Sequence, residues 1–381
     1  MLMIVSAASR AWAHDPSTYG GLFRSHNFGE TWLNADAGLF VNAALTVAVD
    51  PRDPTHLLMG TDTGMVRSQN GGRSWTPEAQ GLIFGAVFAI AFSPDGKTAI
   101  CAAPSGVFRF HDGQWSRATA PDGAAPARTI AWAAQPDRIY LLGPGGLFSS
   151  DDGGRTFRRG AASPEDDTRM TVLAVAREPA EALLAIIDGN LMASRDGGRQ
   201  WTRRAIGQGT GAVDTVVVDE ASPSRQWAAV ADQIYLSDDL GARWRATGTT
   251  LPEPGTNVRG IAADAAASML VVTTHRGLYR SLDGGSTWTL KEGSLPIHLE
   301  SGPLVRDPGD ASTLYAVYSL MPYVEVWHTA LQGGSLLARV DPLSLAGGIA
   351  SLLLLILGGA LLVVRLQRAR SAPPARRSPV P

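Results

Sequence analysis

The sequence is poor in the residues that build disulfide frameworks and metal centres. Cys101 is the only cysteine, so no disulfide bond can form within the chain, and its apolar neighbours predict a buried thiol. The seven histidines are scattered, and no two are separated by two or four positions, so no zinc or copper site is predicted. We therefore expect neither a metal nor another cofactor.

Charge is sparse as well. Charged residues make up 18% of the 381 positions, and the formal net charge is −2. A surface that binds nucleic acid needs a strong local excess of positive charge, so no nucleic-acid partner is predicted. No glycine-rich phosphate loop that opens a helix and no Ser/His/Asp arrangement can be identified, and we assign no catalytic residue.

Glycine is abundant, with 42 residues, and much of it belongs to a repeated hairpin pattern. In residues 277–288, the alternation of Gly-Leu-Tyr-Arg-Ser predicts a short strand. Asp283-Gly284-Gly285 predicts a tight turn, because aspartate bonds its own backbone and glycine tolerates positive φ. Trp288 begins the return strand, and its indole is large enough to anchor the hairpin to a core.

Six near-complete copies of this pattern share the motif Ser-x-Asp/Asn-x-Gly-x-x-aromatic. Ser25 and Ser68 are 43 residues apart, and later copies keep a similar spacing. A shortened copy lies at residues 106–115 and a faded one at 326–334. A period of about 40 to 50 residues with strand-like content is typical of a propeller with one four-stranded blade per period. The motif residues are Ser25, Asn27, Gly29, Trp32, Ser68, Asn70, Gly72, Trp75, Ser150, Asp152, Gly154, Phe157, Ser194, Asp196, Gly198, Trp201, Ser237, Asp239, Gly241, Trp244, Ser281, Asp283, Gly285 and Trp288.

The motif resembles the Asp-box, or BNR repeat, of sialidase-like and photosystem II assembly-factor-like β-propellers, over roughly residues 20–338. In that family the box is a structural turn between the third and fourth strands of a blade, and it carries no catalysis. The assembly-factor branch implies a non-catalytic protein-binding module that helps to build a membrane complex. The alternatives are a sialidase-like glycoside hydrolase and a carbohydrate-binding receptor. A sialidase would need an arginine triad and a Tyr/Glu pair, and Arg128 and Arg259, at first-strand ends, have no identifiable partners.

The repeat predicts an all-β, seven-bladed β-propeller over residues 14–338. The first hairpin lacks a clear first strand, while the last period has strands at 302–305 and 313–318 but no clear box. Pairing these halves closes the ring and hides both sheet edges. An eight-bladed ring is the alternative, if 326–337 is a true hairpin and residues 1–34 form their own blade.

The C-terminal region predicts a membrane anchor. The 22 residues from 343 to 364 carry no charge and, as a helix, would cover the roughly 30 Å hydrocarbon layer. We expect a short linker and transmembrane helix at 339–364, followed by a disordered, basic, proline-rich tail at 365–381. The arginines of the tail place it in the cytoplasm, which puts the propeller on the periplasmic side of the inner membrane.

The N-terminal residues 1–13 resemble the end of a secretory signal, with a small-x-small site at Ala11-Trp12-Ala13. The alternative is that residues 1–7 form a strand of the first blade. For Tyr323 and Trp327, before the predicted span, two roles are open: docking at the membrane interface or filling the last blade.

Arginines gather around two consecutive boxes. They predict a basic rim patch that binds an acidic partner or lipid headgroups, and a solvated rim is the alternative. We expect the partners to be the membrane and another membrane or extracytoplasmic protein. The arginines of the predicted patch are Arg155, Arg158, Arg159, Arg195, Arg199, Arg203 and Arg204.

Overall fold

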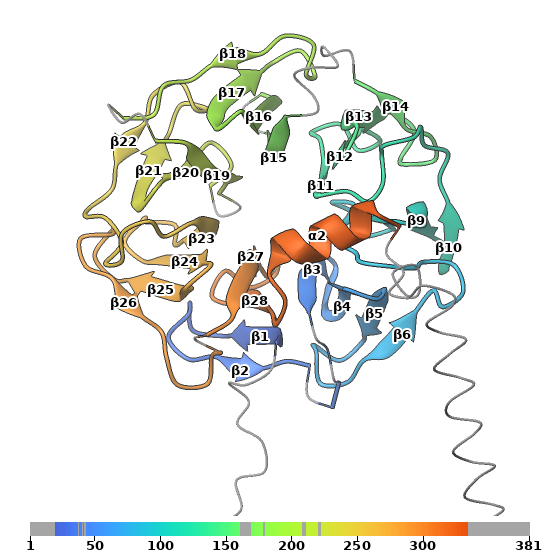
Figure 1. Ribbon diagram of the computed structural model, residues 1–381, viewed down its shortest axis with the longest axis horizontal. Coiled ribbons are helices and arrows are strands. Elements are labelled where there is room, and N and C mark those ends of the chain that lie inside the picture. Colours follow the sequence, from blue (N-terminus) through green and yellow to red (C-terminus); the bar gives the residue numbers. More distant parts are fainter. Residues whose placement is uncertain are drawn as a thin grey trace, which may run out of the picture. The chain divides into compact units, whose positions relative to one another are not determined.

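The computed structural model describes residues 20–333, except 37, 40, 42, 161–168, 178–179, 208–210, 220–221 and 297. Seven four-stranded antiparallel sheets follow one another around a ring, and the innermost strands of neighbouring sheets are in contact (Figure 1). The predicted all-β, seven-bladed propeller is confirmed, and the eight-bladed alternative is wrong. One α-helix is present in the described part of the chain, α2 (Tyr323–Leu331).

Each blade runs from its innermost to its outermost strand in chain order, except blade 7, which combines both ends of the described chain. The strands are, for blade 1, β3 (Ala44–Asp50), β4 (Asp53–Thr61), β5 (Met65–Ser68) and β6 (Thr76–Glu78); for blade 2, β7 (Ala89–Phe92), β8 (Thr98–Ala103), β9 (Gly106–His111) and β10 (Gln114–Arg117); for blade 3, β11 (Thr129–Trp132), β12 (Ile139–Gly143), β13 (Gly146–Ser150) and β14 (Arg158–Arg159); for blade 4, β15 (Met170–Ala176), β16 (Ala182–Ile187), β17 (Asn190–Ser194) and β18 (Thr202–Arg203); for blade 5, β19 (Val213–Val218), β20 (Gln226–Val230), β21 (Gln233–Ser237) and β22 (Arg245–Ala246); for blade 6, β23 (Val258–Ala263), β24 (Leu270–Thr274), β25 (Gly277–Ser281) and β26 (Thr289–Leu290); and for blade 7, β27 (Glu300–Arg306), β28 (Leu314–Ser319), β1 (Gly21–Ser25) and β2 (Leu33–Asn34).

Blade 7 closes the ring by joining the two ends of the propeller. Strand β1 pairs antiparallel with β28, from Gly21 opposite Tyr318 to Ser25 opposite Leu314. The two halves that each lacked a partner in the sequence therefore complete one sheet. As predicted, closure leaves neither strand of this pair with an unpaired inner edge.

The faded hairpin predicted at 326–334 is wrong for its described residues, because 323–331 form α2. The segment has no Asp-Gly turn at the place where a hairpin would need one. Val326, Trp327 and Ala330 lie on one side of the helix and are buried. The spacing of these buried residues follows the helical period, although residues 326–329 also match a strand pattern.

Among the described residues, seven hydrophobic clusters lie between neighbouring blades, one for each pair, and an eighth lies under α2. The aromatic residue of each motif packs against the preceding blade rather than within its own sheet. Trp32, for example, packs with Val271 and Leu278 of blade 6, and the indole N–H of Trp75 donates to the Ala35 carbonyl of blade 7 at 2.8 Å. The repeated aromatic therefore holds successive blades together.

The six motif copies form the same turn between the third and fourth strands of their blades, called the box turn below. In blade 6, the Ser281 hydroxyl donates to Asp283 at 2.8 Å and accepts the Gly285 N–H at 2.8 Å. The other five copies repeat both bonds. Burial acts to raise the pKa of Asp152, but hydrogen bonds from Thr156, Ser150 and backbone N–H groups lower it to about 2. The carboxylates of the motif thus stabilise the box turns.

Arginines on third strands reach the box turn of the next blade. Arg109 of blade 2 donates to the Gly153 carbonyl at 2.8 Å, and Arg280 of blade 6 donates to the Phe28 carbonyl at 2.9 Å. Arg24 of blade 7 donates likewise to Gly71. Charge-assisted bonds of this kind add to the hydrophobic contacts between blades.

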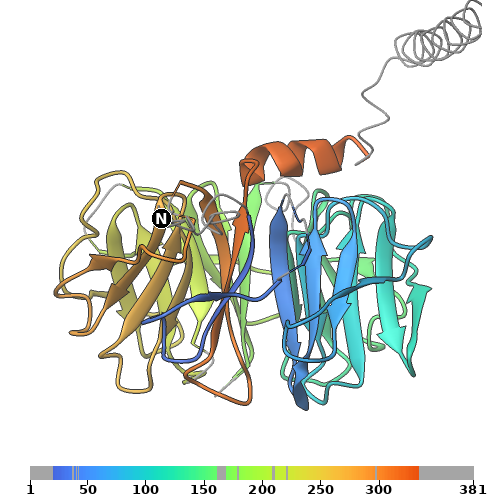
Figure 2. The same cartoon turned by 90° about the horizontal axis from the view of Figure 1, so that it is seen from below.

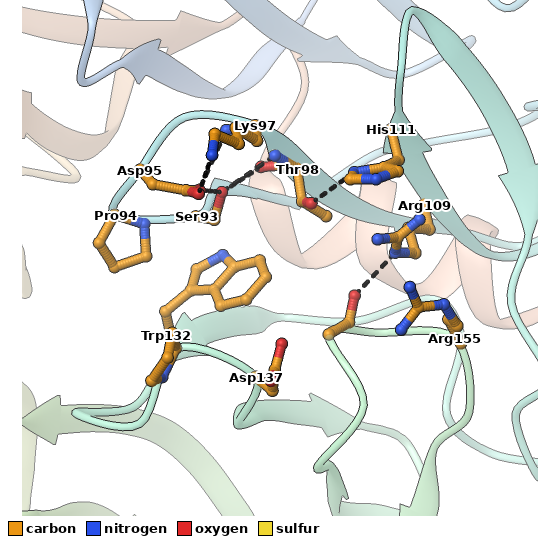
Figure 3. A pocket seen from close by; sticks show the side chains of 12 residues that line it. Ser93, Pro94, Asp95, Lys97, Thr98, Arg109, His111, Trp132, Asp137 and Arg155 are labelled. Carbon is orange, nitrogen blue, oxygen red and sulfur yellow. Dashed lines mark hydrogen bonds and ion pairs between the residues drawn. The ribbon is translucent and has the colours of Figure 1, made fainter.

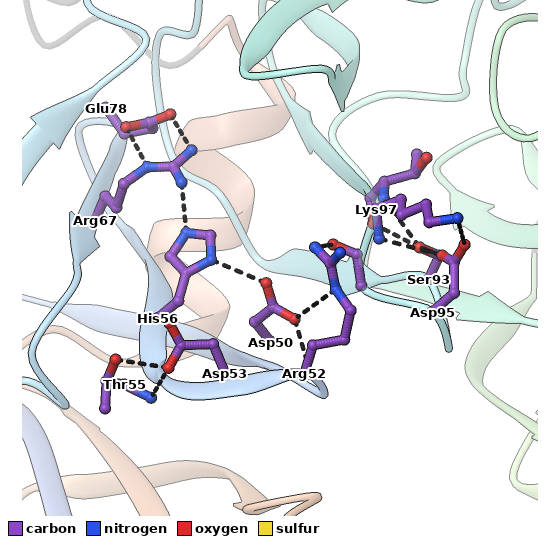
Figure 4. A network of polar contacts seen from close by, with 12 residues as sticks. Asp50, Arg52, Asp53, Thr55, His56, Arg67, Glu78, Ser93, Asp95 and Lys97 are labelled. Carbon is purple, nitrogen blue, oxygen red and sulfur yellow. Dashed lines mark hydrogen bonds and ion pairs between the residues drawn. The ribbon is translucent and has the colours of Figure 1, made fainter.

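A partly buried polar network joins blades 1 and 2 (Figure 4). His56 lies between Asp50, at 3.0 Å, and the guanidinium of Arg67. Arg67 in turn pairs with Glu78 at 2.5 Å, and Trp115 of blade 2 donates to the same carboxylate at 2.6 Å. Burial acts to raise the pKa of Glu78, but the hydrogen bond and charge of Arg67 lower it overall. An Asp–His pair could activate a nucleophile, but here the second nitrogen of His56 faces Arg67.

The ring has two distinct faces. Helix α2 lies across one of them (Figure 2), over the starts of innermost strands, where Ala43 and Leu45 pack against Val326 and Ala330. We call this the α2 face. The third strand of each blade runs parallel to the first, so the box turns lie at the opposite edge, which we call the box face.

No helix among the described residues is long and apolar enough to cross a bilayer. The predicted anchor at 339–364, the tail at 365–381 and the N-terminal segment 1–13 all lie outside the described residues. Their predicted roles remain predictions.

Candidate functional site

A groove of about 280 Å³ opens on the box face between blades 2 and 3 (Figure 3). Blade 2 contributes the turn between β7 and β8, residues 93–97, and the side chains of Arg109 and His111. Blade 3 contributes Trp132, Asp137 and the box-turn residue Arg155. The groove therefore gathers side chains from four segments between residues 93 and 155.

Two arginines lie together in this groove. Arg109 is fixed by its hydrogen bond to the Gly153 carbonyl in the box turn of blade 3, and Arg155 belongs to that same turn (Figure 3). Burial, and next the positive charge of Arg155, lower the pKa of Arg109. Two like charges held this close would be stabilised by an anion placed between or beside them.

A rigid turn presents a third cation. The Ser93 hydroxyl donates to Asp95 at 2.7 Å and accepts the N–H of Thr98 at 3.0 Å, which fixes the turn between β7 and β8. Lys97 lies on this turn with 67% of its side chain exposed, 3.7 Å from Asp95. So exposed a pair is weak, and the ammonium group remains accessible to a ligand.

This arrangement is suited to binding rather than to proton transfer. Lys97, Arg109 and Arg155 outnumber the two carboxylates that line the groove, Asp95 and Asp137. Guanidinium groups match carboxylates as two-pronged donors. No group of three or more His, Cys, Asp or Glu side chains that could hold a metal occurs in the part of the chain that the structure describes.

The seven arginines of the predicted rim patch do not all meet in this groove. Arg155 lines it, whereas Arg158, on β14, forms an ion pair with Asp151. The neighbouring Arg159 donates to the carbonyl of Gly145. Successive strand residues point to opposite sides, so the side chains of Arg158 and Arg159 leave β14 in opposite directions, and both are exposed.

The arginines of blade 4 are placed differently. Arg195, Arg199 and Arg203 are exposed around the box turn and β18. Arg204 is half-buried, and its Nε is buried without a hydrogen-bond partner. A rim patch that includes these four arginines stays a prediction, and only Arg155 of the predicted set lines the groove.

The sequence pattern does not identify Lys97 and Arg109 as site residues, because the box turn of blade 3 that completes the groove lies more than 40 positions later. A signal for Arg109 was present. It occupies the same hairpin position as Arg24, Arg67 and Arg280, in the shortened copy of the motif. A recurrent arginine beside the box serine predicts a contact to the next blade once the ring is known.

The glycoside hydrolase alternative would need free arginines at the channel mouth on the α2 face. Arg128 stacks on the ring of Trp327 at 4.3 Å, and Arg259 lies 4.9 Å from the ring centre of Tyr323 and pairs with Glu300 at 3.0 Å. Helix α2 therefore occupies the position in which these arginines could meet a sugar carboxylate.

The two aromatic residues of α2 have neither of the roles predicted for them. The hydroxyl group of Tyr323 donates to the Ala44 carbonyl at 2.8 Å, and burial raises its pKa. Trp327 is buried against Phe88, with ring centres 5.2 Å apart. Neither ring fills a blade, and Trp327 is too buried to reach a bilayer.

No protein-family model matches the chain, and no curated protein matches its sequence. Solved structures do share its fold. One is YCF48 bound to D1 peptide, with 18% identity and a TM-score of 0.56, covering 74% of this chain and 95% of that one. Another is YCF48 from Cyanidioschyzon merolae, with 16% identity and a TM-score of 0.55, covering 74% and 97%.

A third similar structure is the extracellular domain of a one-component system from B. thetaiotaomicron. It has 11% identity and a TM-score of 0.57, and the match covers 78% of this chain and 40% of that one. At these identities the likeness establishes the fold: this chain is a seven-bladed β-propeller similar in architecture to YCF48.

Proposed function

We propose that this protein is a membrane-anchored, extracytoplasmic propeller that binds another protein during the assembly of a membrane complex, without catalysing a reaction. The observation that carries the proposal is the groove on the box face, where Lys97, Arg109 and Arg155 converge from two blades. We further propose that this groove binds an acidic segment of the partner, with the remaining arginines of the rim patch extending the surface.

The rigidity of the ring and the positive charge of the groove both favour binding of an acidic segment. A propeller presents its loops on a stiff ring, so a groove between two blades needs little reorganisation to bind. Arg109 is already fixed by the Gly153 carbonyl and loses little side-chain entropy on contact with a carboxylate. A protein of similar fold, YCF48, has been solved bound to a D1 peptide, which supports peptide binding as a use of this architecture.

The anchor forms the second part of the proposal. The uncharged run at 343–364 would hold the propeller at the periplasmic side of the inner membrane and raise its local concentration near membrane proteins. Protease treatment of cells and spheroplasts tests this topology. The propeller should be digested once the outer barrier is opened, and digestion only after the inner membrane is breached would refute it.

Site-specific photocrosslinking in native membranes tests the groove. The full-length protein would carry p-benzoyl-phenylalanine in place of Lys97 or, as a control, in place of Arg243, a box-turn residue of blade 5 with 92% of its side chain exposed. We expect a discrete adduct from position 97 that is lost when Arg155→Glu is added. Equal adducts from both positions, or an adduct that survives Arg155→Glu, would show that the groove is not the binding site.

The same preparation tests the alternative activity. A fluorogenic sialoside would be incubated with the purified full-length protein, and turnover that is lost on Arg259→Ala would favour a glycoside hydrolase. We expect no turnover above the buffer blank, because Arg259 is already paired with Glu300 beneath α2.

A further inference from the structure

The α2 face carries an unusual concentration of exposed apolar side chains. Among the described residues, seven large hydrophobic side chains are exposed by more than a third. Two of these are isolated, Leu33 on β2 and Leu282 in the box turn of blade 6. Four others fall within the twelve residues 320–331, and the seventh, Phe84, lies in the loop whose Ala86 and Phe88 contact α2. The four in 320–331 and their exposed fractions are Leu320, 40%; Met321, 37%; Val324, 60%; and Leu331, 44%.

Helix α2 exposes apolar side chains as well as burying them, and the polar Glu325 and His328 are exposed on its outer side too. Its inner side is fixed to the ring by Val326 and Ala330. Val324 and Leu331, seven positions apart, lie together on one flank of the helix, beside the exposed His328. A local concentration of exposed apolar side chains of this kind is typical of an interaction surface.

We propose that this surface, formed by Leu320, Met321, Val324 and Leu331, rests on the lipid bilayer. The inference depends on the membrane anchor of the proposed function. Eleven residues, 332–342, separate α2 from the uncharged run at 343–364, and even a fully extended chain of that length reaches only about 40 Å. A membrane anchor at 343–364 would therefore limit how far α2 can lie from the bilayer.

The outer side of α2 suits the interfacial region of a bilayer. An amphipathic or apolar helix at this boundary lies in the membrane plane with its apolar side chains about 5–10 Å into the headgroup–acyl region. Helix α2 is held flat against the ring by contacts at its start, where the Tyr323 N–H donates to Glu300 at 3.0 Å. The docking surface is therefore preformed and needs no refolding.

If α2 rests on the bilayer, the groove on the box face points away from it. The strands that separate the two faces have up to nine residues, as in β4, so the box face would stand about 25–30 Å from the bilayer surface. Lys97 and Arg155 would then point toward the periplasm. The extracytoplasmic segment of a neighbouring membrane protein could reach them without crossing the lipid.

Fluorescence quenching in vesicles tests the inference on the full-length protein. Cys101 is fully buried, so an introduced cysteine can be labelled selectively with a nitrobenzoxadiazole dye. The variants would be Val324→Cys, Leu331→Cys and, as a matched control, Leu282→Cys, which is 62% exposed on the box face. Each would be reconstituted into phosphatidylcholine–phosphatidylglycerol vesicles with and without nitroxide-labelled lipid, after its melting temperature has been shown to equal that of the parent.

We expect nitroxide lipid to remove at least half of the dye emission at positions 324 and 331 and to leave position 282 nearly unchanged. If the protein floats with the vesicles but positions 324 and 331 are not quenched, the docking surface is wrong while the anchor stands. If it does not float with them, both proposals fail. Dye-free Val324→Cys protein that forms disulfide-linked pairs in vesicles, with no lipid quenching of the labelled form, would assign the surface to a second copy and overturn the inference.

Discussion

Replacing Gly154 by alanine should measure how tightly the box turn is pressed against the preceding blade. Gly154 has a φ of +84°, and a Cβ added there would lie 2.3 Å from Cδ1 of Ile100 in blade 2 and 3.1 Å from Cδ1 of Ile139. The backbone conformation alone costs alanine about 1 kcal/mol. Forcing a methyl group into a packed interface costs about 1–3 kcal/mol more.

Gly113 provides a matched control in the shortened hairpin of blade 2. Its φ is +80°, but a Cβ added there would meet no atom within 4 Å. Gly113→Ala should therefore cost only the backbone term of about 1 kcal/mol. The difference between the two variants isolates the contact between blades.

Differential scanning calorimetry of the two variants measures this difference. For a domain of about 300 residues, with an unfolding entropy of about 2.1 cal/mol/K per residue, 3 kcal/mol lowers Tm by about 5 °C. We expect a loss of that size for Gly154→Ala and about 1–2 °C for Gly113→Ala. Equal shifts in the two variants would refute the argument that the second glycine of the box is required by the neighbouring blade.

Two further predictions concern charge. Arg280→Ala removes the bond to the Phe28 carbonyl between blades 6 and 7 and should lower the free energy of unfolding by about 2 kcal/mol, the contribution of a charge-assisted hydrogen bond. The control Arg245→Ala, at a side chain that is 65% exposed, should lower it by less than about 0.5 kcal/mol. Equal denaturant midpoints for the two variants would contradict this. Burial, and next the negative charge of Asp232, raise the pKa of Asp214 from 3.8 to about 6. The folded state thus binds the proton more tightly than the unfolded state, and the free energy of unfolding should fall as pH rises from about 4 to about 6. Asp214→Asn should abolish this fall, which is about 1 kcal/mol after allowance for solvent screening. Denaturant melts at pH 4 and pH 7 that show the same difference for the parent and the variant would disprove this.

The limits of sequence reasoning are clearest in α2. Four residues around Trp327 match the strand pattern, and in the sequence they support a faded hairpin and the alternative of eight blades. The helical spacing of Val326 and Ala330 was equally present in the sequence. Only the ring decides between these two interpretations, because the residues that bury this side of the helix, such as Leu45, lie about 280 positions earlier.

The candidate site shows the same division. Arg155 could be proposed from the sequence because it lies within a recognisable turn. Lys97 and Arg109 could not be joined to it, because no local signal says which blades are neighbours across a closed ring or how far their turns stand apart. The groove forms only because blades 2 and 3 pack side by side and bring these residues together.

The repeat and the turn in each hairpin are encoded locally, because serine, aspartate and glycine form turns through bonds to residues two to four positions away, whereas the sequence left seven and eight blades both open. The tertiary structure alone decided that the motif's aromatic residue and the neighbouring arginine act between blades, that α2 covers one face, and that three cations meet on the other. These contacts join residues about 40 or more positions apart, and their energies depend on packing and burial, which no local pattern records.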